Sequence, residues 1–380
     1  MNFDWTEEEK QLAQKVKDLF SGEAGKKIQD MEDADVEKLK GMTQGFLKSL
    51  AGTGYLKAAL GPGSRKELLK IMAAQEELSS VSSSLFTAVE TSTRLFGGLV
   101  AGWGSEKACG EILDQIISGS AVGAVAVSEP GSDAAQEGMN TTAKAQGDDY
   151  MLSGEKSYVT NGPLADFIAV GAEVDGKCAF FVVKPDQDGV ETGPRLKTLG
   201  YNGLAVCALT LKDVKVPADH VLGPFGDNSA IRYLSAMQDF ILTLASLGVT
   251  GRMLDASNRH ARAYFRGKKP IYAHQEVRFK ISDMFVLYQT SQLVARRAGW
   301  FWATEDPEAD VLISCAKVFS AEAAEQVSAP AMQIMAGQGY VSPNPVEQGY
   351  RDSKYAALAG TSSEVSRMNI ANALLKRYAI

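Results

Sequence analysis

The residue pattern of the chain changes twice along its length, and this order constrains the fold more than any single motif does. In the first third, apolar residues recur with helical spacing, as at Leu12, Val16 and Phe20. The middle section instead holds short runs of β-branched and aromatic residues, separated by Gly, Asp and Pro. Helical patterns return near Ser229, and 380 residues exceed what one hydrophobic core usually organises. We therefore expect a helical region at 1–121, a β region at 122–228 and a second helical region at 229–380.

Local signals refine this division. Thr6 and Glu9 have the spacing of a capping box, so a helix should begin between them. Residues 65–79 form a helix by composition, and 85–101 form an apolar helix that carries one acid, Glu90. Short strands are expected at 121–127, 150–152, 157–159, 167–170, 179–183 and 206–214. Their close spacing favours a β-barrel or sandwich over alternating βαβ units.

Charge and composition exclude several classes of protein. The net charge of −7 argues against a nucleic-acid binder, which needs a basic face for phosphate. The four cysteines form no CxxC pair and there are three histidines, so we expect no metal site and no disulfide framework. The N-terminus lacks a basic segment typical of a signal peptide, and apolar runs such as 240–245 are shorter than the roughly 20 residues of a membrane span. A cytoplasmic protein without a membrane span fits these features.

The common nucleotide-binding and nucleophile motifs are missing. The sequence has no GxGxxG after a strand, no GxxxxGK[ST] and no GxSxG. If a flavin binds, it is therefore not held by a Rossmann fingerprint.

Five sequence blocks, in order along the chain, resemble those of the acyl-CoA dehydrogenases. The blocks are Val127–Asp133, Leu152–Gly162, Asp213–Pro217, Gln333–Tyr340, and Arg351–Asp352 followed by Gly360–Thr361. This resemblance implies an α+β protein with the acyl-CoA dehydrogenase fold: an N-terminal helical domain, a middle β-barrel or sandwich domain and a C-terminal four-helix bundle. It also implies FAD as the cofactor.

The resemblance assigns cofactor contacts to specific positions. An isoalloxazine that accepts hydride needs hydrogen-bond donors near N1, O2 and N5, where charge develops. The first two blocks usually contact the flavin ring, and the fourth usually meets the adenine half from a neighbouring subunit. The residues carried over are Val127, Ser128, Ser132, Tyr158, Thr160, Gln333, Gly337, Thr361 and Ser363.

Two of the motifs depart from the family pattern. The first block lacks the usual Ala-Gly insert before Ser132, so this loop should be reshaped. A family arginine at the flavin diphosphate usually begins R-x-x-F-G, and in ungapped register Tyr264 takes its place. Either Arg262 or Arg266 is the expected substitute.

The departure that matters most concerns the catalytic base. In this family the residue before the Gly-Thr pair is usually a glutamate, but here it is Ala359, whose methyl group cannot accept a proton. Some members carry the glutamate on an earlier helix, where this chain has Gln238, which is neutral. Asp239 is adjacent but points about 100° round the helix, so we expect a solvated or salt-bridged acid there, with a role as the base as the lesser alternative.

Glu90 is the leading candidate for the base. Burying an acid on a small, apolar helix face raises its pKa, which makes it a functional candidate. The other interpretation is an acid at the end of the pocket that binds water and takes no part in the reaction. The pattern resembles a minority group that forms cyclic conjugated dienes by 1,4-elimination on alicyclic enoyl-CoA thioesters, using a carboxylate on the pocket helix. That group is expected to carry an aspartate, whereas this chain has Glu90 beside Thr91.

The resemblance thus implies an FAD-dependent acyl-CoA dehydrogenase with a relocated base, acting on a cyclic or conjugated acyl-CoA with hydride transfer to flavin N5. Two alternatives stay open: a non-oxidative flavin lyase or desulfinase, and a catalytically inactive acyl-CoA-binding subunit. The thioester carrier is CoA or a carrier protein. The family also implies a homotetramer that passes electrons to an electron-transferring flavoprotein or a similar acceptor.

Overall fold

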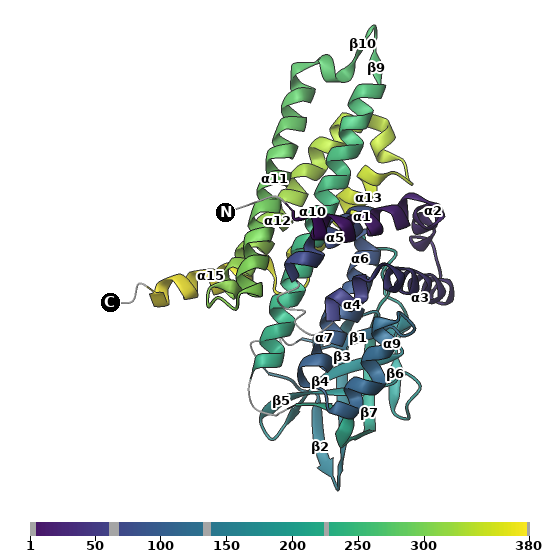
Figure 1. The fold of residues 1–380 in the computed structure, drawn as a ribbon, viewed down its shortest axis with the longest axis vertical. Coiled ribbons are helices and arrows are strands. Elements are labelled where there is room, and N and C mark those ends of the chain that lie inside the picture. The colour runs from purple at the N-terminus through teal and green to yellow at the C-terminus, as the bar shows by residue number, and fades with distance from the viewer. Residues whose placement is uncertain (1–4, 61–67, 132–137, 224–227, 378–380) are drawn as a thin grey trace.

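The computed structural model describes residues 5–60, 68–131, 138–223 and 228–377. Helices come first, a sheet follows and helices return (Figure 1), which confirms the expected fold class. The N-terminal helices are α1 (Glu7–Ser21), α2 (Glu23–Ile28), α3 (Val36–Thr53), α4 (Tyr55–Leu60), α5 (Leu68–Val81), α6 (Ser83–Glu90), α7 (Gly98–Trp103), α8 (Glu106–Ala108) and α9 (Asp114–Ile117).

The helix starts follow the sequence signals closely. The expected capping box is present at α1: the Thr6 N–H donates to Glu9, and the Glu9 N–H donates to Thr6 Oγ1. The apolar helix expected at 85–101 is also present, but it is interrupted after α6 by a π-helical segment, η2 (Thr91–Gly97), before α7 begins. Helical spacing alone does not reveal such an insertion, because it adds one residue to a turn without changing composition.

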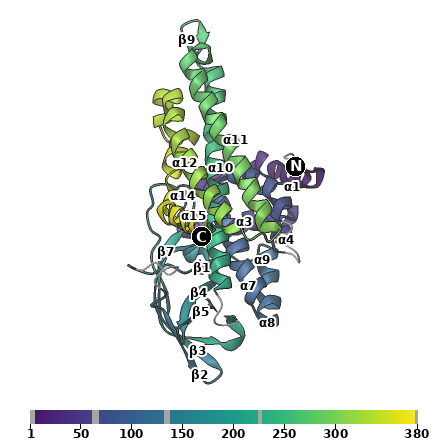
Figure 2. The ribbon, with the colours of Figure 1, turned by 90° about the vertical axis from the view of Figure 1, so that its left-hand side faces the viewer.

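The middle of the chain forms one eight-stranded sheet in the order β6-β7-β3-β2-β4-β5-β8, with β1 paired in parallel to β4. The strands are β1 (Gly123–Ala126), β2 (Thr142–Gln146), β3 (Asp149–Thr160), β4 (Phe167–Val174), β5 (Lys177–Val183), β6 (Val190–Thr192), β7 (Val206–Pro217) and β8 (Val221–Leu222). The sheet lies toward the end of the molecule opposite the β9–β10 hairpin, with α7 and α9 beside it (Figures 1 and 2). Its longest pairing, β3 with β7, is antiparallel and contains two register shifts.

Long helices complete the chain. They are α10 (Ser229–Ala263), α11 (Gln275–Ala303), α12 (Ala309–Met335), α13 (Pro345–Asp352), α14 (Tyr355–Leu358) and α15 (Ser363–Arg377), with the hairpin β9 (Phe265–Arg266) and β10 (Lys269–Pro270) between α10 and α11. Helix α10 packs against α5, α11 and α12, so it joins the N-terminal helices to the C-terminal ones. Helix α15 packs on α12 and projects from the body of the molecule in Figure 1.

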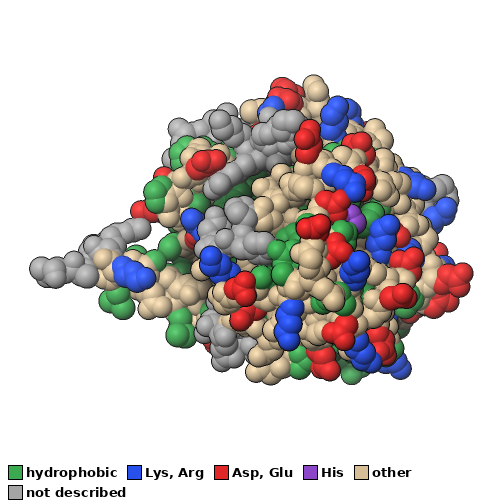
Figure 3. Space-filling model, turned by 90° about the horizontal axis from the view of Figure 1, so that it is seen from below, with side chains coloured by type: hydrophobic (Ala, Val, Ile, Leu, Met, Phe, Trp, Pro, Cys, Tyr) green, Lys and Arg blue, Asp and Glu red, His purple; other side chains and the backbone are tan. Residues whose placement is uncertain are grey.

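The buried apolar residues form separate clusters. The largest is built by the N-terminal helices with α10 and α11, another lies within the sheet, and a third fills the C-terminal helices. Seen from below, acidic and basic side chains alternate over the surface (Figure 3). Within the described ranges, no helix is both long enough and apolar enough to cross a membrane.

Candidate active site

A narrow cavity lies where the helix formed by α6 and η2 meets the sheet and α10. Its volume is about 70 Å³. The lining residues are Thr87, Thr91, Leu95, Val125, Val127, Ser128, Ser157, Tyr158, Thr160, Leu234, Gln238, Ile241, Leu242 and Tyr355. The structure thus brings together four of the residues expected to contact the cofactor: Val127, Ser128, Tyr158 and Thr160. None of the described lining residues carries a carboxylate.

A buried ion pair holds the sheet side of this cavity in place. Lys156 Nζ lies 2.7 Å from Glu129 Oε1 and also donates to the Val127 carbonyl oxygen at 3.1 Å. Both charged side chains are almost fully buried. Burial alone would raise the pKa of Glu129, but hydrogen bonds from Lys156, Thr141 and Asn140 lower it to about 2. The pair therefore fixes the ends of β1 and β3 relative to each other.

The strand next to this pair turns a tyrosine outward. The β3 to β7 pairing shifts register between Lys156 and Val159. Tyr158, inside this bulge, has a left-handed φ of 56° and is 72% exposed. Such a backbone conformation is uncommon for a non-glycine residue and often marks a functional position. The bulge thus presents the Tyr158 ring at the cavity mouth.

Several buried hydroxyl groups in or near the cavity have no hydrogen-bond partner in the described chain, so the cavity could bind a polar ring system. Thr87 Oγ1 and Ser157 Oγ in the lining, and Ser363 Oγ at the start of α15, are buried without a hydrogen-bond partner in the described part of the chain. Buried polar groups are normally paired, so such groups point to a ligand that pairs with them. These donors, the exposed Tyr158 ring and the hydroxyls of Ser128 and Thr160 fit an isoalloxazine ring.

Glu90 lies directly behind the helical wall of the cavity. Thr87 and Thr91 line the cavity, but Glu90 is fully buried and its carboxylate faces α4 and α5. The Tyr55 hydroxyl donates to Glu90 Oε1 at 2.5 Å, and Gln75 Nε2 donates to Oε2 at 2.7 Å. The expected helix therefore lines the pocket, while the structure does not bring the Glu90 carboxylate to its surface.

The surroundings of Glu90 favour its protonated form. Burial raises the pKa of Glu90, and the Arg94 charge and the hydrogen bonds from Tyr55 and Gln75 oppose this only in part. No cation forms an ion pair with Glu90 among the residues that the structure describes. A raised pKa is the property expected of a carboxyl group that exchanges protons near neutral pH.

Ala359 stands where the family usually carries its glutamate, and its backbone is held by a buried lysine. Lys317 Nζ donates to the Ala359 carbonyl oxygen at 2.9 Å and lies 3.5 Å from Asp239 Oδ1. Gly360 has a φ of 63°, and a Cβ there would lie 2.8 Å from Asp239 Oδ1, so this position requires glycine. The Thr361 N–H donates to the same carboxylate oxygen at 3.0 Å.

Asp239 is thus committed to structure. Burial raises the pKa of Asp239, while Lys317 and Thr361 lower it. Its carboxylate is absent from the cavity lining, whereas the neighbouring Gln238 lines it. The expectation of a salt-bridged acid describes Asp239 well, but the alternative of a solvated acid is wrong because the residue is 4% exposed.

The other expected cofactor residues lie away from this cavity within one chain. Arg262, at the end of α10, and Arg266, in β9, are exposed at the far tip of the molecule. Gln333 ends α12, and Gly337 lies in the turn that follows; both are exposed. These four positions therefore stay predictions that require a neighbouring subunit. Ser132 lies outside the described residues.

Several lining residues were missed by the sequence analysis. Thr87, Thr91 and Leu95 recur every four residues, a signal that a helix places one face toward a common space. Ile241 and Leu242 lie one turn after Gln238 but have no distinguishing sequence signal. Contact between these helices arises from tertiary packing, which spacing along one helix does not reveal.

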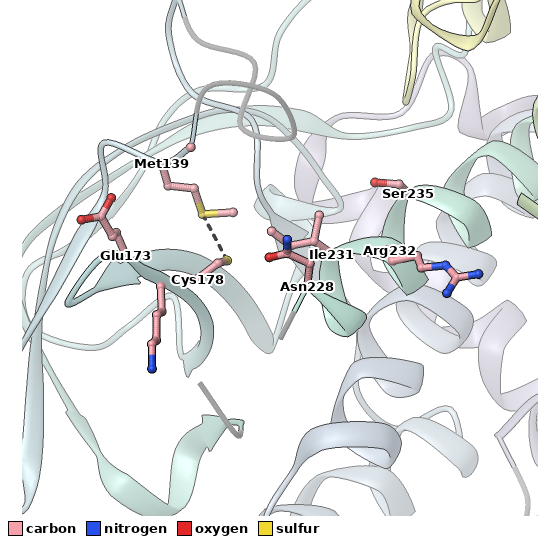
Figure 4. Close-up of a pocket in the computed structure, with 10 residues that line it drawn as sticks. Met139, Glu173, Cys178, Asn228, Ile231, Arg232 and Ser235 are labelled. Carbon is pink, nitrogen blue, oxygen red and sulfur yellow. Dashed lines mark hydrogen bonds between the residues drawn. The ribbon is translucent and has the colours of Figure 1, made fainter. Parts of the chain in front are cut away.

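Figure 4 shows a second, more open cavity, with a volume of about 400 Å³. Met139 and Cys178 line it from the sheet region, facing Ile231 and Ser235 from the start of α10. Its lining also includes two cationic side chains, those of Lys177 and Arg232. Helix α10 therefore presents residues to both cavities, since Leu234, next to Ser235, lines the narrow one.

Comparison with known proteins decides the family. The models of the N-terminal, middle and C-terminal domains of acyl-CoA dehydrogenases match residues 6–120, 124–214 and 238–375. Cyclohexane-1-carbonyl-CoA dehydrogenase of Geobacter metallireducens is 30% identical over 285 residues, which cover 73% of this chain and 74% of that protein. The chain belongs to the acyl-CoA dehydrogenase family. It is therefore an oxidoreductase acting on acyl-CoA with FAD as its cofactor, as the sequence motifs predicted.

Further relatives cover nearly the whole chain. Human mitochondrial short-chain specific acyl-CoA dehydrogenase is 29% identical over 91% of this chain and 86% of that protein. The caffeyl-CoA reductase-Etf complex subunit CarC of Acetobacterium woodii is 28% identical over 98% of this chain and 100% of that protein. Among solved structures, butyryl-CoA dehydrogenase from Megasphaera elsdenii superposes with a TM-score of 0.90 at 23% identity, over 99% of this chain and 100% of that chain. A glutaryl-CoA dehydrogenase from Mycobacterium smegmatis, in complex with FADH2, superposes with a TM-score of 0.88 at 21% identity, over 99% of this chain and 96% of that one.

Proposed function

We propose that this member of the family is a dehydrogenase with a relocated base that acts on a cyclic or conjugated acyl-CoA. One observation carries the proposal. The cavity at the flavin-contact motifs is lined by no described carboxylate, and Glu90 lies buried immediately behind its helical wall. A carbon remote from the thioester becomes acidic through conjugation, so its base is needed deeper in the pocket than the usual glutamate.

The residues of the sheet wall hold and orient the cofactor. FAD, when bound, supplies the hydride acceptor. Ser128, Ser157 and Thr160 line the cavity with hydroxyl groups that would donate to the ring, on which negative charge develops. Tyr158 would contact the ring, and the buried pair of Lys156 and Glu129 keeps this wall rigid.

Glu90 takes the proton from the substrate carbon after its side chain turns from Tyr55 and Gln75 toward the cavity. The Thr87 hydroxyl is buried, lines the cavity and has no partner in the described chain, so it is free to bond to the Glu90 carboxyl group in that turned position. The raised pKa of Glu90 suits a group that must both accept and release this proton. Gln238, which is neutral, positions the acyl group and exchanges no proton.

The open cavity of Figure 4 binds the handle of the thioester. Its cationic residue Lys177 suits a phosphate group of CoA, whereas Arg232 is paired with Asp310. Ile231 and Ser235 lie on the same face of α10 as the residues of that helix that line the acyl cavity. One face of α10 would therefore contact both the handle and the acyl group of a bound thioester. A shortened thioester without phosphates should bind far more weakly if CoA, rather than a carrier protein, is the natural handle.

Exposed apolar residues support assembly into a homotetramer. On α11, the side chains of Phe279, Phe285, Val286, Leu293 and Trp300 are 48% to 58% exposed. Helix α15 projects from the body and exposes Met368 and Leu375. Large exposed apolar surfaces mark interfaces. Such an assembly would bring Arg262, Arg266, Gln333 and Gly337 of a neighbouring subunit to the FAD, and an electron-transferring flavoprotein then takes its electrons.

The reverse reaction is a second candidate. The relative CarC is named as part of a caffeyl-CoA reductase-Etf complex, so a related protein is assigned to reduction of a conjugated acyl-CoA. Both directions need the same carboxyl group, because the proton removed in one direction is the proton delivered in the other.

The test mixes FAD-loaded protein anaerobically with straight-chain and alicyclic acyl-CoA thioesters and follows the flavin absorbance near ~450 nm. Bleaching with alicyclic or conjugated substrates alone supports the proposal. Bleaching with straight-chain saturated substrates at similar rates contradicts it.

Other outcomes of the same experiment favour the alternative functions. Release of CoA or sulfite without bleaching favours the non-oxidative lyase or desulfinase, and no reaction with any thioester favours an inactive binding subunit. Reoxidation of the pre-reduced flavin by a conjugated enoyl-CoA identifies the reductive direction.

A further inference from the structure

A third cavity adjoins the open cavity of Figure 4, with which it shares Asn228 and Arg232, and its lining includes a buried arginine. Its volume is about 450 Å³, and it is lined by Arg94 and the aromatic rings of Trp103, Tyr233 and Trp302. It shares no lining residue with the narrow acyl cavity. We call it the Arg94 cavity.

Arg94 is poorly satisfied for a buried cation. It is 3% exposed, and it donates to the Ala59 carbonyl oxygen at 3.5 Å and to Met237 Sδ at 3.4 Å. Both contacts are long or weak, and Nε has no partner within the described residues. The Arg94 charge acts on the nearby Glu90 carboxyl group. A guanidinium has five N–H donors, however, and leaving buried donors unpaired is unfavourable. The oxygens of Glu90, the carboxylate closest along the helix, are already engaged by Tyr55 and Gln75.

The aromatic walls of the Arg94 cavity are fixed by neighbouring contacts. The Trp103 and Tyr233 ring centroids lie 5.5 Å apart, and those of Tyr233 and Trp302 lie 6.2 Å apart. Trp103 Nε1 donates to Ser229 Oγ at 3.1 Å, and the Tyr233 hydroxyl donates to the Arg94 carbonyl oxygen at 2.6 Å. A pocket with preformed aromatic walls and one convergent polar group is typical of a small-molecule site.

We propose that the Arg94 cavity binds a small arylcarboxylate or a carboxylate with a similarly flat apolar body. A carboxylate accepts two parallel hydrogen bonds from a guanidinium fork, and the rings provide surface for the apolar part. A monoanion fits best, because Arg94 is the one fully buried cation of the lining. Arg232 at the rim is exposed and already lies 2.5 Å from Asp310. This site is independent of the reaction proposed above.

The experiment titrates the FAD-loaded protein with benzoate and follows tryptophan fluorescence, with calorimetry as a second readout. We expect saturable binding, and at least about tenfold weaker binding of benzamide, which has the same ring without the charge. Inorganic phosphate should not compete, and saturating CoA should leave benzoate binding unchanged. Equal binding of benzamide and benzoate, displacement by CoA, or no saturable binding would each overturn the proposal.

Variants locate the binding to this cavity. Arg94→Gln should weaken benzoate binding at least about tenfold, since a charge-assisted hydrogen bond is lost. Because that buried position risks misfolding, Trp103→Ala, at a half-buried wall position, provides a second test and should weaken benzoate more than acetate. Arg232→Gln is the matched control and should change the affinity less than threefold. Unchanged benzoate binding in Trp103→Ala, or in folded Arg94→Gln, would place the ligand elsewhere and contradict the proposal.

Discussion

Two buried carboxylates flank the acyl cavity, and their partners differ in kind. Asp239 lies 3.5 Å from the Lys317 ammonium and accepts the Thr361 N–H. Glu90 has neutral donors, Tyr55 and Gln75, and no ion pair in the described chain. Burial raises the pKa of both acids. The Lys317 charge opposes this at Asp239 through an ion pair, whereas the Arg94 charge opposes it at Glu90 without an ion-pair contact in the described chain.

The difference assigns distinct roles to the two acids. A carboxylate beside a buried cation cannot change its charge without leaving that cation uncompensated, so Asp239 is suited to a structural role. A carboxyl group held by neutral donors can gain or lose a proton while its hydrogen bonds rearrange. Gln75 Oε1 has no partner in the described chain, so the Gln75 amide can turn to present an acceptor to a protonated Glu90. Glu90 is therefore the acid whose protonation state can follow the reaction.

The largest effect should come from breaking the charged pair. Asp239→Asn leaves the Lys317 ammonium buried without a counter-ion and also weakens the acceptor of the Thr361 N–H. We expect the free energy of unfolding, measured by urea denaturation of the FAD-loaded protein, to fall by about 3–5 kcal/mol.

A double variant separates charge from packing at this site. Lys317→Met combined with Asp239→Asn removes both charges and should recover much of the lost stability. A loss below about 1 kcal/mol in Asp239→Asn alone would show that the pair is not the structural element inferred here.

A smaller loss of stability is expected when a neutral hydrogen-bond donor of Glu90 is removed. Tyr55→Phe removes the hydroxyl that donates to Glu90 Oε1 and leaves the ring in place. The hydrogen bond lowers the pKa of Glu90, so its loss should raise this pKa further and move the pH profile of flavin reduction to higher pH. Unfolding free energy should fall by about 1–3 kcal/mol. A pH profile identical to that of the wild type would contradict the coupling between Tyr55 and Glu90.

The smallest expected effect is the pH dependence of stability, which tests whether the pKa of Glu90 is raised in the folded protein. Because the pKa of Glu90 is raised above its ordinary value of 4.5, the folded state binds more protons than the unfolded state just above that pH. Its contribution to stability is therefore fully present below the unfolded pKa and is lost as pH rises through the folded pKa.

Comparing the wild type with Glu90→Gln isolates this contribution. The wild-type stability relative to the variant should decline as pH rises above about 4.5, the ordinary pKa of the residue. The measurement is urea unfolding at several pH values. A difference that stays constant with pH would show that Glu90 keeps an ordinary pKa in the folded protein.

The sequence predicted the sheet wall of the site better than the helical wall. The hydroxyl groups and tyrosine of that wall occur in two short family motifs, and the resemblance to the family groups Ser128 with Tyr158 and Thr160. The order of helical and β regions and the capping box at Thr6 were likewise predicted, because both depend on local pattern.

The environment of each acid could not be predicted, because its partners come from other elements. Tyr55 is 35 residues from Glu90, and Lys317 reaches Asp239 from α12. Helical spacing places Glu90 on a helix that lines the pocket, yet the direction of its side chain depends on α4 and α5 packing behind it. The π-helical segment that begins at Thr91 shifts the helical register of the residues after Glu90, and it leaves no signature in composition.

The measurement that tests the central claim most directly is the anaerobic rate of flavin reduction by an alicyclic enoyl-CoA in wild type and Glu90→Gln. If Glu90 is the base, the variant should bind FAD normally and reduce it at least about 100-fold more slowly. Glu76→Gln is the matched control, since Glu76 is a half-buried acid on α5 that pairs with Arg296 and Gln292 of α11, and it should leave the rate unchanged. Flavin reduction in Glu90→Gln within a few-fold of the wild-type rate would contradict the account.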